Sequence, residues 1–235
     1  GGFDIVIGNP PYIKEYENKA AFNDFRECSP YYMGKMDLWY GFACSSIDIL
    51  KTNGILCFIA TNNWVTNAGA FLLRNKIIID TQILQMIDFG NYMVFEDSAS
   101  IQTMIMLFSH SKNKLKYKFD YRKLIKSKPV QTDANNLLIS KEKEAIYLYP
   151  QIDRKEYINK TFTFNGNDKD IVLSRMVQDA DYLNKNEATN GIHPHYDFVN
   201  KKIARKYPEV KIGEGIFGLS KKEKENLNLT SAEKE

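Results

Sequence analysis

A short apolar segment, Phe3–Ile7, leads directly into the sequence Gly-Asn-Pro-Pro-Tyr at residues 8–12. The aromatic and β-branched side chains of this segment predict a buried strand that ends at the glycine and the proline pair. Each proline restricts the residue before it, so the loop leaves the strand in an extended, stiff conformation. We therefore expect the Asn9 amide, the Pro10 carbonyl and the Tyr12 ring to be fixed relative to one another.

The groups that this loop would fix suit the recognition of a planar amine. Oxygen acceptors from Asn9 and Pro10 can take both hydrogens of one amine, while the face of Tyr12 stacks on the flat ring that carries it. In open α/β sheets, ligands bind outside the carboxyl ends of the strands, where this loop would lie. The alternative is a strand followed by a proline-rich turn, with Tyr12 packed on the surface.

The sequence Asn9-Pro10-Pro11-Tyr12 after a hydrophobic strand resembles the catalytic motif of amino-group methyltransferases, chiefly those that act on N6 of adenine in DNA. The resemblance implies that S-adenosylmethionine is the methyl donor and that double-stranded DNA is the partner. It also implies that Asn9 and Pro10 accept hydrogen bonds from the exocyclic amine. Tyr12 would stack on the flipped-out base. Solvent can take the proton that the amine loses, so no general base is required.

The residues that follow predict alternating helices and strands. Apolar residues at helical spacing indicate a helix over residues 36–50, with Asp37 near its N-terminus, and a second helix over residues 70–79. Buried strands are predicted at residues 55–60, 82–89 and 101–108, with a polar loop at 62–64. We therefore expect an α/β fold, namely the second half of a Rossmann-like S-adenosylmethionine-dependent methyltransferase sheet that finishes in an antiparallel pair.

A second aromatic residue is expected beside the target base. In the family that the chain resembles, the loop between the last two strands carries such a residue, and here the loop over residues 91–98 contains Phe95. Flipping a base out of the duplex costs a few kcal/mol, and aromatic stacking returns about 1–3 kcal/mol per base. Tyr12 and Phe95 together would therefore offset the cost. The alternative role of Phe95 is to cap the core.

The residues that bind S-adenosylmethionine are unknown and are expected upstream of Gly1, with Asn9 bordering that site. The run Gly213–Gly218 fits the pattern G-x-G-x-x-G, but the charged and polar residues after it predict no packed helix, so we do not assign it to cofactor binding. Glu17–Lys19 has the E-x-K form of a nuclease site without a partner acid, and we interpret the match as chance.

The C-terminal part resembles the opening of a target-recognition domain, through residues 188–198 and 213–217. The likeness is to bifunctional type IIG restriction-modification enzymes, which join a nuclease, an adenine methyltransferase and a recognition domain. It implies that nuclease and cofactor-binding regions lie upstream in the same polypeptide. We expect the catalytic half of the methyltransferase domain at 1–123, a linker and bridging helix at 124–185, and the truncated start of the recognition domain at 186–235.

The net charge is only +3, but basic residues gather between residues 112 and 128, with Asp120 as the single acid among them. Alternation over residues 114–121 predicts an edge strand whose lysines discourage edge-to-edge pairing. Contact with DNA phosphates is the equally supported alternative. From about residue 124 to residue 164 the pattern weakens into a polar linker with short structured pieces, and residues 168–183 predict the bridging helix.

The remaining composition bears on location and on metals. Three cysteines, Cys28, Cys44 and Cys57, are odd in number and not spaced as metal ligands, which favours a reducing, bacterial cytoplasmic location. His193 and His195 lack partners at ligand spacing, so no metal is expected. No signal peptide or membrane-spanning segment is evident in the sequence.

These observations favour a site-specific adenine-N6 DNA methyltransferase of a restriction-modification system, of which this fragment alone would be inactive. Two alternatives stay open. The same motif also serves methyltransferases that act on a protein glutamine amide or on RNA. The fragment could also be a non-catalytic DNA-binding remnant, because its cofactor half is not part of the sequence.

Overall fold

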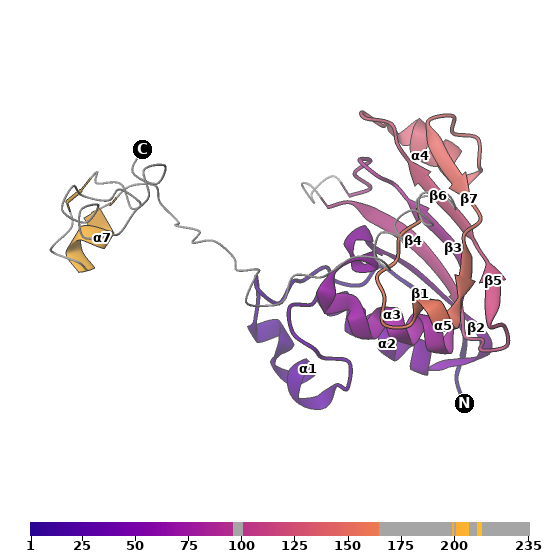
Figure 1. Cartoon of the computed structure of the whole chain (residues 1–235), viewed down its shortest axis with the longest axis horizontal. Coiled ribbons are helices and arrows are strands. Elements are labelled where there is room, and N and C mark those ends of the chain that lie inside the picture. Colours follow the sequence, from indigo (N-terminus) through magenta and orange to yellow (C-terminus); the bar gives the residue numbers. More distant parts are fainter. Residues whose placement is uncertain (96–100, 165–198, 200, 207–210, 213–235) are drawn as a thin grey trace, which may run out of the picture. The chain divides into compact units, whose positions relative to one another are not determined.

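The computed structural model describes residues 1–95, 101–164, 199, 201–206 and 211–212. It divides into two compact units, Gly1–Asp179 and Ala180–Glu235. The second unit contributes the helix α7 (Lys201–Lys206) to the described residues. All the other elements below belong to the first unit (Figure 1).

A six-stranded sheet forms the centre of the first unit, in the order β1-β2-β4-β3-β6-β7. Its strands are β1 (Phe3–Gly8), β2 (Leu50–Thr61), β3 (Gln82–Asp88), β4 (Thr103–Ser109), β6 (Asp120–Leu124) and β7 (Ala145–Leu148). The pairs β1–β2 and β3–β6 are parallel, whereas β4 pairs antiparallel with both β2 and β3, and β7 pairs antiparallel with β6. The four strands β1, β2, β3 and β6 therefore run in one direction, and their carboxyl ends meet at one edge of the sheet.

This topology confirms the predicted fold class. The chain is α/β, and β3 and β4 form the antiparallel pair that was expected to finish the sheet, with β4 inserted between β2 and β3. The helices α2 (Leu38–Asp48) and α3 (Phe71–Asp80) connect the strands as predicted. The polar loop after β2 forms two short 3₁₀ turns, Asn62–Val65 and Ala68–Ala70.

The main core lies between the sheet and the helices α2 and α3, which pack side by side (Figure 1). Aromatic and branched side chains from both layers interdigitate there, and the largest fully buried ones include Trp39, Trp64, Tyr40, Phe108, Leu56 and Ile77. The rings of Trp39 and Trp64 meet edge to face with centroids 6.4 Å apart. Close packing of this kind fixes the strand ends relative to one another.

The prediction that β1 is a buried strand is wrong, because none of its residues is fully buried. The strand lies at the edge of the sheet, and the side chains of Phe3, Ile5 and Ile7 are 58%, 64% and 76% exposed. An open edge that also presents three apolar side chains is an unusual surface for a folded protein, because such edges pair readily with another strand.

Residues 114–164 differ most from the sequence-based expectation. The predicted edge strand over residues 114–121 is wrong, because the chain breaks at Phe119 into β5 (Lys116–Lys118) and β6. The first pairs with β8 (Gln151–Asp153) in a separate two-stranded sheet, and the second lies inside the main sheet. The polar linker with short structured pieces that was expected from residue 124 contains α4 (Gln131–Leu138), β7 and α5 (Arg154–Tyr157), which belong to the first unit.

Other predictions fall outside the described residues. The bridging helix at 168–183, the Gly213–Gly218 run, His193 and His195 all belong to this group, as does most of the region 186–235. The short helix α1 (Asn23–Cys28) lies in the segment between β1 and α2.

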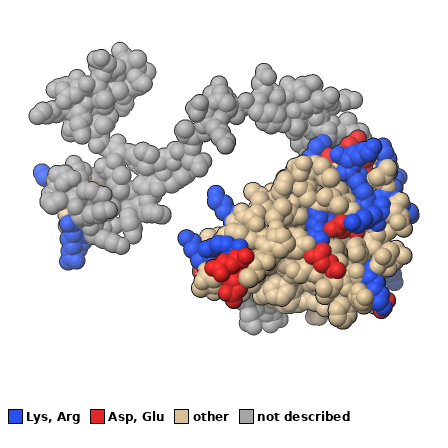
Figure 2. Space-filling view, turned by 90° about the horizontal axis from the view of Figure 1, so that it is seen from below, with Lys and Arg blue, Asp and Glu red and all other residues tan. Residues whose placement is uncertain are grey.

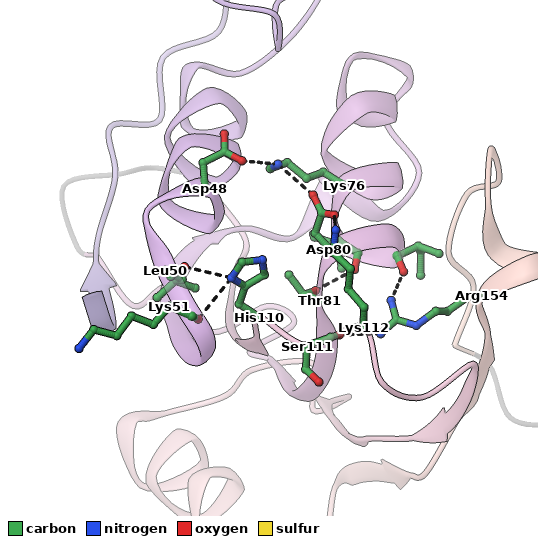
Figure 3. A network of polar contacts seen from close by, with 12 residues as sticks. Asp48, Leu50, Lys51, Lys76, Asp80, Thr81, His110, Ser111, Lys112 and Arg154 are labelled. Atoms are coloured by element: carbon green, nitrogen blue, oxygen red, sulfur yellow. Dashed lines mark hydrogen bonds and ion pairs between the residues drawn. The ribbon is translucent and has the colours of Figure 1, made fainter. Parts of the chain in front are cut away.

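At the amino ends of the parallel strands, polar side chains satisfy one another (Figure 3). The Lys76 ammonium donates to Asp48 at 2.6 Å and to Asp80 at 3.0 Å, and Asp80 also pairs with Lys112 at 2.7 Å. Although burial opposes it, these carboxylates together with the Tyr31 hydroxyl raise the pKa of Lys76 above its ordinary value. Each of these four charged side chains therefore has a partner of opposite charge at the amino ends of the strands.

Near this network, the buried Arg154 side chain makes a second set of polar contacts. Its guanidinium donates to the carbonyl oxygens of Ile78, Ser111 at 2.8 Å and Lys114 at 2.7 Å, and it lies over the ring of Tyr117. A planar fork with several donors matches converging carbonyls that no other side chain could satisfy at once. Arg154 therefore joins α5 to the end of α3 and to the chain after β4.

We expect Arg154→Met to lower the free energy of unfolding by about 3 kcal/mol, because it leaves buried carbonyl oxygens without donors. Urea unfolding followed by the fluorescence of Trp39 and Trp64 would measure the change. The control is Lys155→Met on the same helix, whose side chain is exposed. A loss no larger than that of the control would show that Arg154 does not join these segments.

Candidate active site

The loop after β1 adopts a defined geometry around Tyr12. The hydroxyl of Tyr12 donates its hydrogen to Asn9 Oδ1 at 2.5 Å and to the carbonyl oxygen of Ile59 at 2.8 Å. Burial, and then the negative charge of Asp37, raise the pKa of Tyr12 to about 12, so this hydroxyl stays protonated and acts as a donor. The predicted residues Asn9 and Tyr12 are thus brought together.

The prolines between them have different environments. Pro10 is buried, whereas Pro11 and Asn9 are exposed, so the loop is fastened at its base and presents the asparagine at the surface. The contact between Tyr12 and Ile59 ties the loop to β2, the strand that neighbours β1. The loop is therefore held at both ends.

The ring of Phe95 lies opposite the ring of Tyr12. The two centroids are 6.2 Å apart, and the ring planes are inclined by 57°. Phe95 comes from the loop between β3 and β4, as the sequence predicted, and it is half-buried. Two aromatic rings from segments more than eighty residues apart thus meet at the carboxyl edge of the sheet.

A cavity of about 400 Å³ opens beside the ring of Tyr12. Its lining presents polar and apolar surface and comes from the loop after β1, the end of β2, the turn after it and the residues before β4: Tyr12, Lys14, Glu17, Thr61, Asn62, Asn63, Ile101 and Gln102. A volume of this size is typical of small-molecule sites. The sequence predicted a polar loop at residues 62–64 but assigned no role to its asparagines.

A second cavity, of about 440 Å³, shares Asn62 and Asn63 with the first. Asn62 Nδ2 donates to Asp88 Oδ1 at 3.1 Å, and Asp88 at the end of β3 pairs with Lys123 at 3.4 Å. The segment 162–164 forms part of this wall. Residues beyond the expected boundary at 123 therefore help to shape the strand-end surface.

Arg74 on α3 holds the turn that carries Asn62 and Asn63. Its buried guanidinium donates to the carbonyl oxygens of Trp64 and Asn67, both at 2.6 Å, and to that of Lys160 at 3.2 Å. These contacts hold the 3₁₀ turns after β2 and the segment before Phe162 in one arrangement.

Asp37 immediately precedes α2 and lies close enough to Tyr12 for its charge to act on the Tyr12 hydroxyl. Its side chain is 3% exposed, and within the described structure neither carboxylate oxygen accepts a well-aligned hydrogen bond. Burial raises the pKa of Asp37 to about 7, although the backbone N–H of Trp39 lies near enough to favour the charged form. The sequence predicted a carboxylate at the helix N-terminus but not its burial.

The basic stretch is largely neutralised in the structure. Lys112, Lys116, Arg122, Lys123 and Lys126 each pair with an aspartate. Figure 2 shows acidic side chains among the basic ones on the face in view. Such pairs weaken the attraction of this stretch for phosphates, so it does not form a uniform basic surface.

The described residues contain neither a metal-ligand cluster nor a membrane-spanning helix. Among them, no three His, Cys, Asp or Glu side chains are grouped so that they could hold a metal ion. In the part of the chain that the structure describes, no helix is long and apolar enough to cross a membrane.

The titration of Asp37 predicts a pH dependence of stability. Because its folded pKa of about 7 lies above the ordinary value, the folded state binds the proton more tightly, and stability falls as the pH rises from about 4 to about 7. Asparagine at this position cannot ionise and remains suitable before a helix. We therefore expect the free energy of unfolding of wild type, relative to Asp37→Asn, to decrease over this range and to level off above it. Urea unfolding at a series of pH values would measure the difference, and a constant difference would contradict the assignment.

The segment that carries this site is similar to known proteins. Residues 1–95 match the model of the Eco57I restriction-modification methylase family. The type II methyltransferase M.BstVI of Geobacillus stearothermophilus is 26% identical over 165 residues, which are 69% of this chain and 28% of that protein. The type II restriction enzyme and methyltransferase RM.Eco57I of Escherichia coli is 26% identical over 109 residues, which are 45% of this chain and 11% of that protein.

The chain thus spans less than a third of the length of either relative. Among solved structures, the type IIG restriction endonuclease BpuSI is similar with a TM-score of 0.44 and 12% identity, over 67% of this chain and 20% of that one. Residues 1–95 contain the Asn9–Tyr12 loop, Asp37, Asn63 and Phe95. The predicted resemblance to restriction-modification methylases is confirmed for residues 1–95, which match the Eco57I family, whereas the target-recognition domain stays a prediction.

Proposed function

We propose that the protein containing this chain transfers a methyl group from S-adenosylmethionine to N6 of a flipped-out adenine in double-stranded DNA, within a restriction-modification system. The main support is the position of Tyr12 at the carboxyl ends of the parallel strands, where it bonds to Asn9, meets the ring of Phe95 and lines a cavity. These residues lie within the segment that matches a restriction-modification methylase.

The loop after β1 offers acceptors for the target amine. Asn9 Oδ1 has two lone pairs, of which the Tyr12 hydroxyl occupies one, so the other is free for an amine hydrogen. The Pro10 carbonyl would accept the second hydrogen. Two acceptors in the plane of the amine leave its nitrogen lone pair as the group that attacks, and the proton then leaves to solvent.

The Tyr12 hydroxyl can adjust when the amine binds. It carries a single hydrogen that Asn9 Oδ1 and the Ile59 carbonyl share. If the amine donates to Asn9, the phenolic hydrogen can remain on the Ile59 carbonyl, so no acceptor or donor is left without a partner. The ring of Tyr12 then stays anchored to β2 while the base is bound.

The two aromatic rings must separate to admit the base. A base between them requires about 7 Å, which is two van der Waals contacts of about 3.5 Å, whereas the centroids are 6.2 Å apart and the rings are tilted. Tyr12 is anchored through its hydroxyl, so we infer that Phe95 moves. In the closed arrangement each ring covers the other, and a flipped base would replace that contact.

S-adenosylmethionine supplies the electrophilic methyl group when it is bound. The open edge and exposed apolar side chains of β1 fit further strands beside Asn9, where the cofactor-binding residues would lie. A nuclease in the same polypeptide is supported by the name of RM.Eco57I, a restriction enzyme and methyltransferase. Asn9 would stand at the border between cofactor and target.

A glutamine amide or an RNA base could present a similar planar amine to Asn9. We favour DNA because the matched relatives are named type II methyltransferases or restriction enzymes. The polar cavity next to Tyr12 is also large enough for a purine. A remnant that binds DNA without catalysis would need no acceptors in this arrangement.

The rings give the most specific test. In the full-length protein, Tyr12→Ala and Phe95→Ala should strongly reduce methylation of matched duplex DNA, because each removes a face that stacks on the flipped base. Part of the activity should return when the target adenine lies opposite a mismatch, since flipping then costs less. Tyr12→Phe and Phe95→Trp retain a ring and should remain active. Transfer of a radioactive methyl group to defined duplexes would measure all four variants.

The matched control is Tyr149→Ala, which removes an exposed ring that follows β7 at the amino ends of the parallel strands, opposite to the ends where Tyr12 and Phe95 lie. Its activity should equal that of wild type on both substrates. If Tyr12→Ala and Phe95→Ala lose activity by the same factor on matched and mismatched DNA, with lowered melting temperatures, the rings belong to the core and not to the target site.

A further inference from the structure

A chain of hydrogen bonds leads from the core to the first cavity. The indole Nε1 of Trp39 donates to Thr61 Oγ1 at 3.0 Å, and the Thr61 hydroxyl donates to Asn63 Oδ1 at 3.1 Å. The Tyr40 hydroxyl approaches the same oxygen at 3.5 Å. Trp39, Tyr40 and Thr61 are all buried, whereas Asn63 is exposed.

The donors in this chain determine which way the Asn63 amide points. An indole nitrogen can only donate, so Thr61 Oγ1 accepts from Trp39 and its own hydrogen must go elsewhere. The hydrogens of Thr61 and Tyr40 converge on one atom of Asn63, and buried hydroxyls need acceptors. That atom is therefore the carbonyl oxygen, and the NH₂ group of Asn63 is turned away from the core.

The NH₂ group has no acceptor among the contacts of the described residues, and Asn63 lines the cavity that Tyr12 also lines. Asn62, its neighbour, differs in this respect, because its own Nδ2 donates to Asp88 and to Gln102. Among the described residues of the turn after β2, Asn63 therefore presents an oriented and unused amide donor in the cavity that Tyr12 lines.

We propose that Asn63 determines substrate specificity by donating a hydrogen bond from Nδ2 to one of the two ring nitrogens that flank the amine of the target base. This rests on the proposed function. Asn9 and Pro10 accept from the amine, so a donor is the complement that recognises the neighbouring lone pair. Adenine offers N7 on one side of its amine and N1 on the other, and both are acceptors.

Asn63→Asp separates this role from a structural one. Aspartate has nearly the same shape and keeps an oxygen for the Thr61 hydroxyl, but it has no hydrogen to donate. The matched control is Asn67→Asp, one turn further along. It adds the same charge and keeps the side-chain acceptor for Gly69 N, and its residue lines neither cavity. The full-length protein would carry each substitution.

The assay measures kcat/KM for methylation of duplexes with adenine, 7-deazaadenine or 1-deazaadenine at the mapped target position. On adenine, Asn63→Asp should lose roughly tenfold or more, as expected for a lost hydrogen bond in a desolvated site. Asn67→Asp should match wild type. Wild type itself should lose a similar factor on one deaza base only, and Asn63→Asp should show no further loss on that base.

The pair of analogues identifies which nitrogen accepts the bond. Thr61→Val, which removes the hydroxyl that orients the amide, should give a smaller loss with the same dependence on the base. An equal loss for Asn63→Asp on all three bases would make its role structural and overturn the proposal, as would activity equal to that of Asn67→Asp. If wild type methylates no DNA, the proposed function fails first and the role of Asn63 fails with it.

Discussion

The parallel pairing of β1 with β2 is the constraint on which the site depends. It sets Gly8 beside Phe58, and a side chain at Gly8 would come within 3.3 Å of that ring. With the strands in this register, the loop after β1 begins beside the last residues of β2. The Tyr12 hydroxyl can then reach the Ile59 carbonyl, and the asparagine turn after Thr61 lies next to the ring.

The amino ends and the carboxyl ends of the parallel strands differ in how fully their polar side chains are hydrogen-bonded or paired. At the amino ends of the strands, the side chains of Lys76, Asp80 and Arg154 are paired with one another or with carbonyl groups. At the carboxyl ends, Asn63 and Asn9 are oriented by protein contacts yet retain unused bonding capacity. A rigid frame with unsatisfied groups at one edge is the arrangement that binding and catalysis require.

Much of this arrangement could be predicted from local sequence. The strand Phe3–Gly8 and the stiff loop after it depend on short segments with strong turn and apolar signals, whereas the aromatic residue at position 95 was expected from the family resemblance. The order of β2, β3 and β4 followed from the same kind of pattern. These signals act over a few residues, and the fold merely brings them together.

The parts that could not be predicted depend on contacts between distant residues. The donor orientation of Asn63 depends on Trp39, and the burial of Asp37 depends on residues 13–15, whose backbone pairs with residues 36–38. Residues 124–164 have weak periodicity because β7, β8 and α5 are only three or four residues long, too short to repeat a helical or strand pattern. Their place in the fold comes from long-range pairing with β6 and from Arg154, which no local pattern reveals.

In the proposed function, Asn9 and its loop direct methyl transfer to an amino group of DNA. Mass spectrometry of the nucleosides from DNA treated with the full-length protein and S-adenosylmethionine tests it directly, with Asn9→Ala as the comparison. We expect N6-methyldeoxyadenosine from wild type and none from Asn9→Ala, while both bind DNA with similar affinity. Methylation at a carbon atom of a base, no methylated base with wild type, or equal product from Asn9→Ala would contradict the claim.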